Sequence, residues 1–158
     1  MKYSVLVFFI LFFVSVGHSQ ECKSFNDYKA EGKDVTILDS LYPAAMHIDS
    51  NLAVFHGREQ EFFLAWKTML QDLATYLDEN EFYWGGQMWC FNRVYFSPNG
   101  KVDTYLFKFK EDTVDEEKQK AFAALLSDFT SDYTLKIDSA AKSQFAQCGP
   151  VTYLDKEN

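Results

Sequence analysis

The chain has 158 residues, 47% of them hydrophobic and 24% charged, and carries a formal net charge of −8 at pH 7. A chain of this length forms one domain and buries a core without metal or disulfide support. Three prolines and seven glycines exclude a fibrous or low-complexity protein. Acidic residues are spread over the sequence, and because such a surface repels phosphate groups we expect no nucleic-acid partner and no anionic-lipid surface.

The N-terminal segment has the layout of a secretory signal peptide. After a short charged start, an apolar run extends over Val5–Val16, and the small residues Gly17 and Ser19 resemble a cleavage site. The run holds about a dozen residues, whereas a bilayer-spanning helix needs about 20. We therefore predict a signal peptide over residues 1–19, no transmembrane segment after its cleavage, and a periplasmic or extracellular location.

The segment after this cleavage site is polar and contains Gly32. We expect residues 20–34 to be an exposed lead-in and residues 35–158 to form a single domain. The run Val35–Leu38 fits either a short strand or the start of a helix that Pro43 interrupts, because a short apolar run does not distinguish the two.

Residues 58–79 are predicted to form an amphipathic helix. Glu59 and Glu61 place negative charge in its first turn, which suits the positive end of the helix dipole. Apolar side chains recur at steps of three and four along the segment. They are Phe62, Trp66, Met69, Leu73, Tyr76 and Leu77.

A β-hairpin is predicted next. Gly85-Gly86 breaks the chain, and residues 88–96 and 101–110 are rich in aromatic and β-branched side chains. Asn99-Gly100 lies between the two runs, and both residues tolerate the positive φ that a tight turn requires.

A second helix is predicted over residues 114–132. Thr113 and Glu116 have the spacing of a capping box, in which each side chain binds a free backbone N–H at the helix start. The apolar stripe behind this box comprises Phe122, Leu125, Leu126, Phe129 and Tyr133.

The C-terminal part predicts three short elements. Residues 135–137 fit a short strand, Asp138 fits the cap of a short helix over residues 139–147, and Gly149-Pro150 ends that helix. Residues 151–154 fit an edge strand or third strand. Together the predicted elements define an α+β fold, with two amphipathic helices packed on a small antiparallel sheet built around the hairpin.

Three cysteines follow the predicted cleavage site, and export favours one disulfide among them. Cys90 lies in an apolar strand-like run, which favours a buried and free thiol. Three pairings are open, and we favour Cys22 with Cys148, which lie in loop-like sequence near the two ends. Gln20-Glu21 argues against lipidation of Cys22, because a lipidation site has small residues there.

His47, Asp49 and His56 are the candidate metal ligands, with Glu59 close behind them. They supply nitrogen and oxygen donors that suit zinc, but their spacing matches no established ligand pattern. Ordinary surface or capping histidines are the favoured interpretation. The sequence contains no nucleophile-elbow, zinc-protease or phosphate-loop motif, and we expect no cofactor.

Tyr83, Trp84 and Trp89 surround the glycine pair between the first helix and the hairpin. One interpretation is a flat stacking platform that binds a sugar or another apolar ligand. The other is that these rings cover the core where the helix joins the hairpin, and we favour it.

Four segments resemble the C-terminal domain of TonB-type envelope proteins. They are Tyr76–Asn80 at a helix end, Arg93–Phe96 in the hairpin, Asn99–Val102 at its turn and Pro150–Tyr153 near the end. The resemblance covers about half of the chain and implies an α+β fold with a protein-binding role at a sheet edge. The tyrosine-proline step common after the first helix in that family is replaced by Phe82-Tyr83-Trp84. Since the sequence shows no membrane anchor or proline-rich spacer, energy transduction is not implied.

The leading functional hypothesis is an exported, non-catalytic binding or protein-interaction module of the periplasm or cell exterior. Its partner is expected to be an unknown protein or a small apolar or sugar ligand. The alternative is a small exported enzyme or metal-binding protein that uses His47, Asp49 and His56, or a cysteine with one of these histidines.

Overall fold

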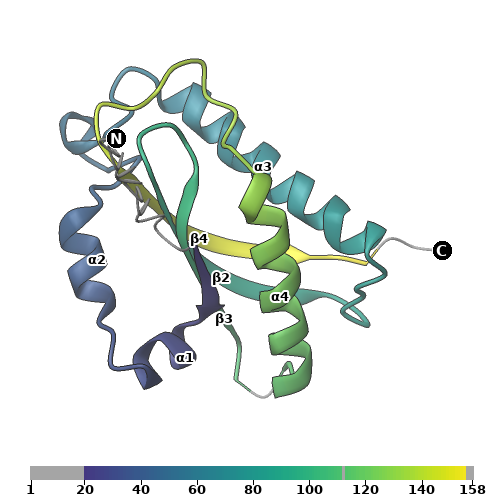
Figure 1. Cartoon of the computed structure of the whole chain (residues 1–158). Coiled ribbons are helices and arrows are strands. Elements are labelled where there is room, and N and C mark those ends of the chain that lie inside the picture. Colours follow the sequence, from purple (N-terminus) through teal and green to yellow (C-terminus); the bar gives the residue numbers. More distant parts are fainter. Residues whose placement is uncertain (1–19, 112, 156–158) are drawn as a thin grey trace, which may run out of the picture.

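The computed structural model describes residues 20–111 and 113–155, and the predicted signal peptide lies outside them. In chain order the elements are β1 (Glu21–Ser24), α1 (Phe25–Ala30), α2 (Val35–Leu41), a 3₁₀ turn (Ser50–Leu52), α3 (Glu59–Glu79), β2 (Met88–Phe96), β3 (Val102–Phe109), α4 (Glu116–Asp132) and β4 (Phe145–Tyr153) (Figure 1). The α+β fold expected from the sequence is confirmed.

The four strands form one sheet in the order β1-β3-β2-β4. β2 pairs antiparallel with both β3 and β4, whereas β1 pairs parallel with β3. The sheet is therefore mixed. The prediction of a purely antiparallel sheet is wrong for the β1–β3 pair.

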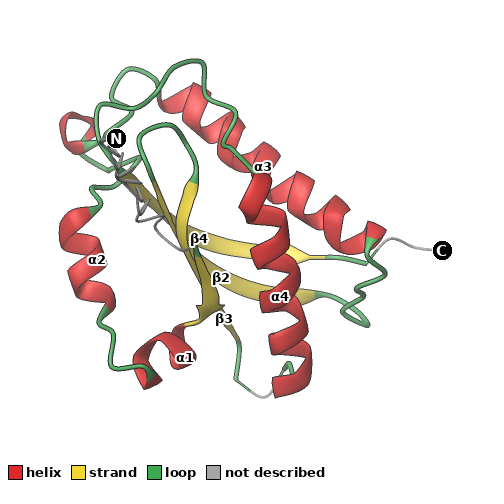
Figure 2. Ribbon diagram, in the orientation of Figure 1, coloured by secondary structure: helices red, strands yellow, loops and turns green. Residues whose placement is uncertain are grey.

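The two faces of the sheet have different cover (Figure 2). The face that carries Cys90, Val94 and Phe107, called the core face below, packs against α3 and α4 and holds the main hydrophobic core. On the opposite face, called the second face below, a smaller cluster forms where Tyr28 of α1 packs with Tyr95 and Leu106.

Helix α3 confirms the predicted amphipathic helix, which begins within one residue of the expected position. Its apolar stripe lies on the core face, where Phe62, Met69 and Leu73 are fully buried. At its start, two of the Arg58 guanidinium nitrogens, Nε and Nη2, donate to the Glu61 carboxylate at 2.8 and 2.6 Å.

The β2–β3 hairpin is also as predicted. Gly100 has φ +84° at the turn, and its N–H donates to the Ser97 carbonyl at 2.9 Å. A Cβ atom at Gly100 would lie 3.1 Å from the Leu135 Cβ. Both the backbone conformation and the close approach of Leu135 therefore require glycine here.

The N-terminal region differs from the prediction. Residues 20–34 are not an exposed lead-in, because they contribute β1 and α1, and Ser24 and Tyr28 are buried. β1 is held by parallel pairing with β3, which lies far away in sequence. The run Val35–Leu38, for which a strand and a helix were both open, belongs to helix α2. The N-cap of α2 is Asp34, whose carboxylate accepts from the Thr36 N–H at 2.8 Å.

The start of α4 also differs. The predicted capping box at Thr113 and Glu116 does not form, because the N-cap is Asp115, whose carboxylate accepts from the Lys118 N–H at 2.7 Å. The Thr113 hydroxyl instead donates to the Lys110 carbonyl at 2.7 Å, within the preceding turn.

The C-terminal elements were largely mispredicted. In the described part of the chain, residues 139–147 form no helix and residues 135–137 form no strand. Strand β4 instead runs from Phe145 through Gly149-Pro150 to Tyr153. Continuous pairing with β2 overrides the helix-ending signal of Gly149-Pro150. Proline is tolerated because β4 is an edge strand and the position of the missing N–H faces away from β2.

The favoured Cys22–Cys148 disulfide is wrong, since all three cysteines are free. Cys22 lies in β1 and Cys148 in β4, at opposite edges of the sheet. Three strand spacings separate them by about 14 Å, and a disulfide requires Cα atoms within about 7 Å. Cys90 is buried as expected, and burial raises the pKa of its thiol to about 12.

Candidate binding groove

The outer edge of β4 is covered over only part of its length. The N–H of Ala45 donates to the Ala146 carbonyl at 2.8 Å, and the Ala146 N–H donates to the Pro43 carbonyl at 2.9 Å. Backbone groups alternate along a strand, so Cys148, Pro150 and Thr152 face the same way as Ala146. Within the described residues none of these three forms a hydrogen bond with another backbone group on that side, although the Cys148 carbonyl accepts one from the Gln147 side-chain Nε2 at 2.9 Å. Residues 148–152 are called the open edge of β4 below.

A groove lies between the C-terminal half of β4 and helix α3, with a volume of about 460 Å³. Apolar side chains dominate its walls, and Lys67 is its one charged lining residue among those described. The apolar lining residues include Phe63, Leu70 and Ala74 of α3 and Val151 and Leu154 at the end of β4.

These apolar side chains remain accessible to solvent. Phe63 is 52% exposed and Leu154 is 70% exposed, and Leu64 beside Phe63 is 53% exposed. Helix α3 thus carries apolar residues beyond the stripe that packs on the core face. A contiguous exposed apolar surface on a charged protein marks a site of interaction.

A smaller hollow of about 100 Å³ continues the groove toward the helix end. It shares Ala74, Tyr153 and Leu154 with the groove and reaches Tyr83. From Phe63 to the end of this hollow, α3 rises about 22 Å at 1.5 Å per residue. This length accommodates roughly seven residues of extended chain.

The far end of the groove is fixed by a hydrogen-bonded loop. The carboxylate of Asp155 accepts from the consecutive N–H groups of Trp84, Gly85 and Gly86, at 2.7, 2.7 and 3.0 Å. The hydrogen bond from Trp84 is the main cause that lowers the pKa of this carboxyl below its usual range. Gly85 has φ +82°, which a residue with a side chain rarely adopts and which lets the N–H groups converge.

The structure does not bring Tyr83, Trp84 and Trp89 together as one platform. Trp84 is 8% exposed and packs in the main core, where its ring contacts Phe109 and Tyr153 at centroid distances of 5.2 and 5.4 Å. Trp89 lies on the second face, paired with Thr152, and Tyr83 is exposed at the end of the groove. The core-covering interpretation therefore holds for Trp84.

The candidate metal ligands fall into two separate local structures, one with His47 and Asp49 and the other with His56. The Asp49 carboxylate caps the 3₁₀ turn by accepting from the Asn51 N–H at 3.1 Å, while the Asp49 N–H donates to His47 Nδ1 at 3.0 Å. His56 Nδ1 lies 3.9 Å from Glu59 on the surface. Across residues 20–111 and 113–155, no three His, Cys, Asp or Glu side chains are grouped to hold a metal ion. The geometry gives the metal hypothesis no support.

The groove was not predicted from the sequence. A signal was present in Phe63 and Leu64, two adjacent apolar residues outside the main stripe of α3. The wall formed by β4 could not be predicted from the sequence. It depends on β4 continuing through Pro150, which places Val151 beside α3.

Comparison of the chain with protein-family models, with curated proteins and with solved structures finds no match. Among the described residues, none of the helices combines the length and apolar character that a membrane span requires. The fold and the groove define this chain as an α+β protein with a partly open sheet edge.

Proposed function

We propose that the chain is an exported, non-catalytic interaction module, and that an extended polypeptide segment binds along the open edge of β4. The observation that carries this proposal is the position of that edge beside an exposed apolar groove. A strand added to a sheet edge forms backbone hydrogen bonds, and its alternate side chains point toward one face. On the core face of β4 those side chains enter the groove against α3.

The open edge favours a foreign segment over a second copy of β4. Cys148 and Thr152 have N–H groups that face outward, whereas Pro150 between them has none. A proline at this position interrupts the regular row of donors that edge-to-edge aggregation requires. Side-chain contacts in the groove therefore contribute a large part of the binding energy, and we expect the bound segment to be apolar at alternate positions.

Two sequence features support the proposal. The signal-peptide pattern at residues 1–19 supports export. The resemblance to TonB-type C-terminal domains implies protein binding at a sheet edge, which is the same kind of surface. Within the described residues no cluster of His, Cys, Asp and Glu side chains is placed to hold a metal ion, and the groove is the strongest candidate site.

The test is selection from a phage-displayed library of random peptides of about ten residues, a length that covers the groove in extended form. Chemical-shift changes in ¹H–¹⁵N spectra of the labelled protein locate the selected peptides. We expect shifts at residues 63–74 and 148–154, with protected amides in the peptide.

Two pairs of variants test whether the peptide binds in the groove or adheres non-specifically. Phe63→Asp places a charge in the groove and Thr152→Pro removes an outward N–H, and both are expected to weaken binding at least tenfold. Ile37→Asp places the same charge on α2, where Ile37 is 60% exposed, and Thr152→Val retains the N–H. Both controls should bind normally. Failure to select any peptide, or equal binding by all four variants, contradicts the proposal.

A further inference from the structure

A second hollow, with a volume of about 710 Å³, lies on the second face of the sheet and involves none of the groove residues. Its walls come from α1, the turn after it, the start of α2 and the adjacent strands β2 and β3. The volume lies within the range of about 300–1,000 Å³ that is typical of small-molecule sites. We call it the lysine hollow.

The apolar part of the lysine hollow is formed by Phe25, Val35 and Phe91. All three side chains are partly exposed, and the rings of Phe25 and Phe91 lie 6.2 Å apart at 44°. α1 ends at Ala30, and the turn at Gly32 leads the chain away to α2. This short helix leaves apolar side chains of the second face uncovered.

The charged residues that line this hollow, among those described, are Lys29, Lys33, Lys108 and Asp34. Asp34 is the N-cap of α2, and its carboxylate accepts from the Thr36 N–H. In a chain of net charge −8, a group of three lysines around one apolar hollow is an exception to the prevailing charge.

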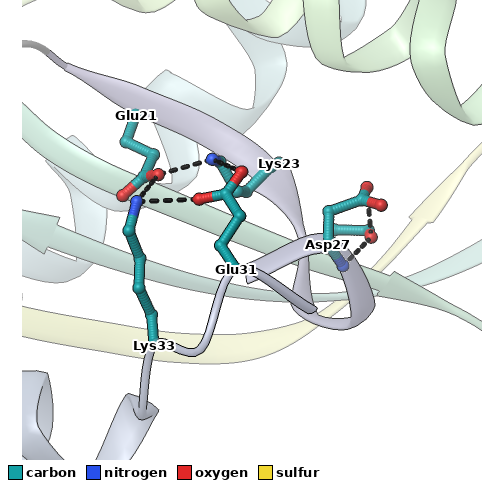
Figure 3. A network of polar contacts seen from close by, with 6 residues as sticks. Glu21, Lys23, Asp27, Glu31 and Lys33 are labelled. Carbon is teal, nitrogen blue, oxygen red and sulfur yellow. Dashed lines mark hydrogen bonds and ion pairs between the residues drawn. The ribbon is translucent and has the colours of Figure 1, made fainter. Parts of the chain in front are cut away.

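Among the described residues, carboxylates pair with only one of the three lysines. Figure 3 shows Lys33 Nζ between the carboxylates of Glu21 and Glu31, with Glu31 Oε2 at 2.9 Å. Lys29 and Lys108 have no ion pair or side-chain hydrogen bond within the described residues. Two ammonium groups therefore remain available beside the apolar surface.

We propose that the lysine hollow binds a medium-chain fatty carboxylate. Its hydrocarbon chain covers Phe25, Val35 and Phe91, and its carboxylate pairs with the free ammonium groups of Lys29 and Lys108. Apolar burial supplies most of the affinity, and the lysines select for negative charge. A free fatty acid rather than a bilayer is the source, because the acidic protein surface is repelled by anionic lipid. This site is independent of the peptide groove.

The test is an NMR titration of the ¹⁵N-labelled protein with sodium decanoate below its critical micelle concentration. We expect saturable shifts at residues 25–35, 91 and 108. Decyltrimethylammonium, which has the same chain and the opposite charge, should bind at least tenfold more weakly, and decanol should bind with intermediate affinity.

Variants assign the role of the lysines. Lys29→Gln with Lys108→Gln removes two exposed charge pairs and should weaken decanoate binding about tenfold. Lys29→Arg with Lys108→Arg should retain binding, as should the control Lys101→Gln with Lys142→Gln at exposed lysines that line neither the hollow nor the groove. Unchanged spectra, shifts at Phe63 and Val151 instead, or equal affinity of the glutamine and control variants overturns the proposal. Phe63→Asp should leave decanoate binding intact, so the outcome is separate from that of the peptide experiment.

Discussion

The carboxylate of Asp155 accepts a hydrogen bond from the backbone N–H of Trp84 at 2.7 Å. This contact joins the segment that follows β4 to the loop that follows α3, at the point where the binding groove ends. Trp84 is itself anchored in the core by its ring, so the position of its N–H is fixed. The groove therefore ends at a loop that is held by hydrogen bonds and by a buried ring.

Replacing Asp155 by Asn should lower the free energy of unfolding at neutral pH by about 1 kcal/mol, since the charge-assisted hydrogen bonds lie near solvent. The folded-state pKa of Asp155 is lowered, so its contribution is present above the unfolded pKa near 3.9 and is lost as the pH falls through the folded pKa. Urea unfolding at pH 7 and pH 2.5 measures this difference.

The stability difference between parent and Asp155→Asn should shrink at the lower pH. The control is Asp128→Asn, at an exposed position on α4, which should have little effect at either pH. A difference that persists unchanged in acid would mean that the carboxylate charge is not what stabilises the loop.

Trp84→Ala should lower the free energy of unfolding by about 3–5 kcal/mol, because it removes a buried aromatic ring and leaves a cavity. Tyr83→Ala and Trp89→Ala should each cost much less, since these side chains are 45% and 44% exposed. Thermal unfolding followed by circular dichroism compares the three. A Trp84→Ala protein as stable as the parent would contradict its role in the core.

The three thiols should react in two classes. Cys148 is exposed and should be alkylated in the native protein within minutes at pH 8, whereas burial raises the pKa of Cys22 to about 11 and that of Cys90 to about 12. Those two thiols should react only on unfolding. Peptide mapping of the unreduced, denatured protein should find label on all three cysteines. A Cys22–Cys148 disulfide would contradict the strand order, which places β1 and β4 at opposite edges of the sheet.

Helix α4 offers a direct comparison of two caps. Asp115→Ala should cost about 1 kcal/mol, the usual value for loss of an N-cap side chain. Thr113→Ala removes only a hydrogen bond in an exposed turn and should change stability by less than about 0.5 kcal/mol. Equal effects, or a larger effect at Thr113, would restore the capping box that the sequence suggested.

Local patterns were sufficient for α3 and for the β2–β3 hairpin. The spacing of Phe62, Met69 and Leu73 requires a helix if one face is to be buried, and Asn99-Gly100 supplies the positive φ of the turn. These features act between residues close in sequence, so the tertiary structure did not need to change them. The adjacent apolar residues Phe63 and Leu64 could also be recognised in the sequence. The sequence did not indicate that Phe63 lines a groove.

The remaining elements depend on partners that are distant in sequence. β1 is a strand because β3 offers it an edge, and β4 passes through Gly149-Pro150 because nine residues of β2 pair with it. Strand pairing supplies backbone hydrogen bonds that outweigh weak local conformational preferences. The local sequence does not indicate which distant strand will be the partner.

Both proposed sites arise from this long-range pairing. The sequence alone determined the amphipathic helix that forms one wall of the groove, the aromatic core and the acidic charge. Only the tertiary structure placed the open edge of β4 beside Phe63, separated Cys22 from Cys148, and set Lys29 and Lys108 around the same hollow. The physical reason is that a binding surface is formed by side chains from several elements, and their proximity is decided by the order of strands in the sheet.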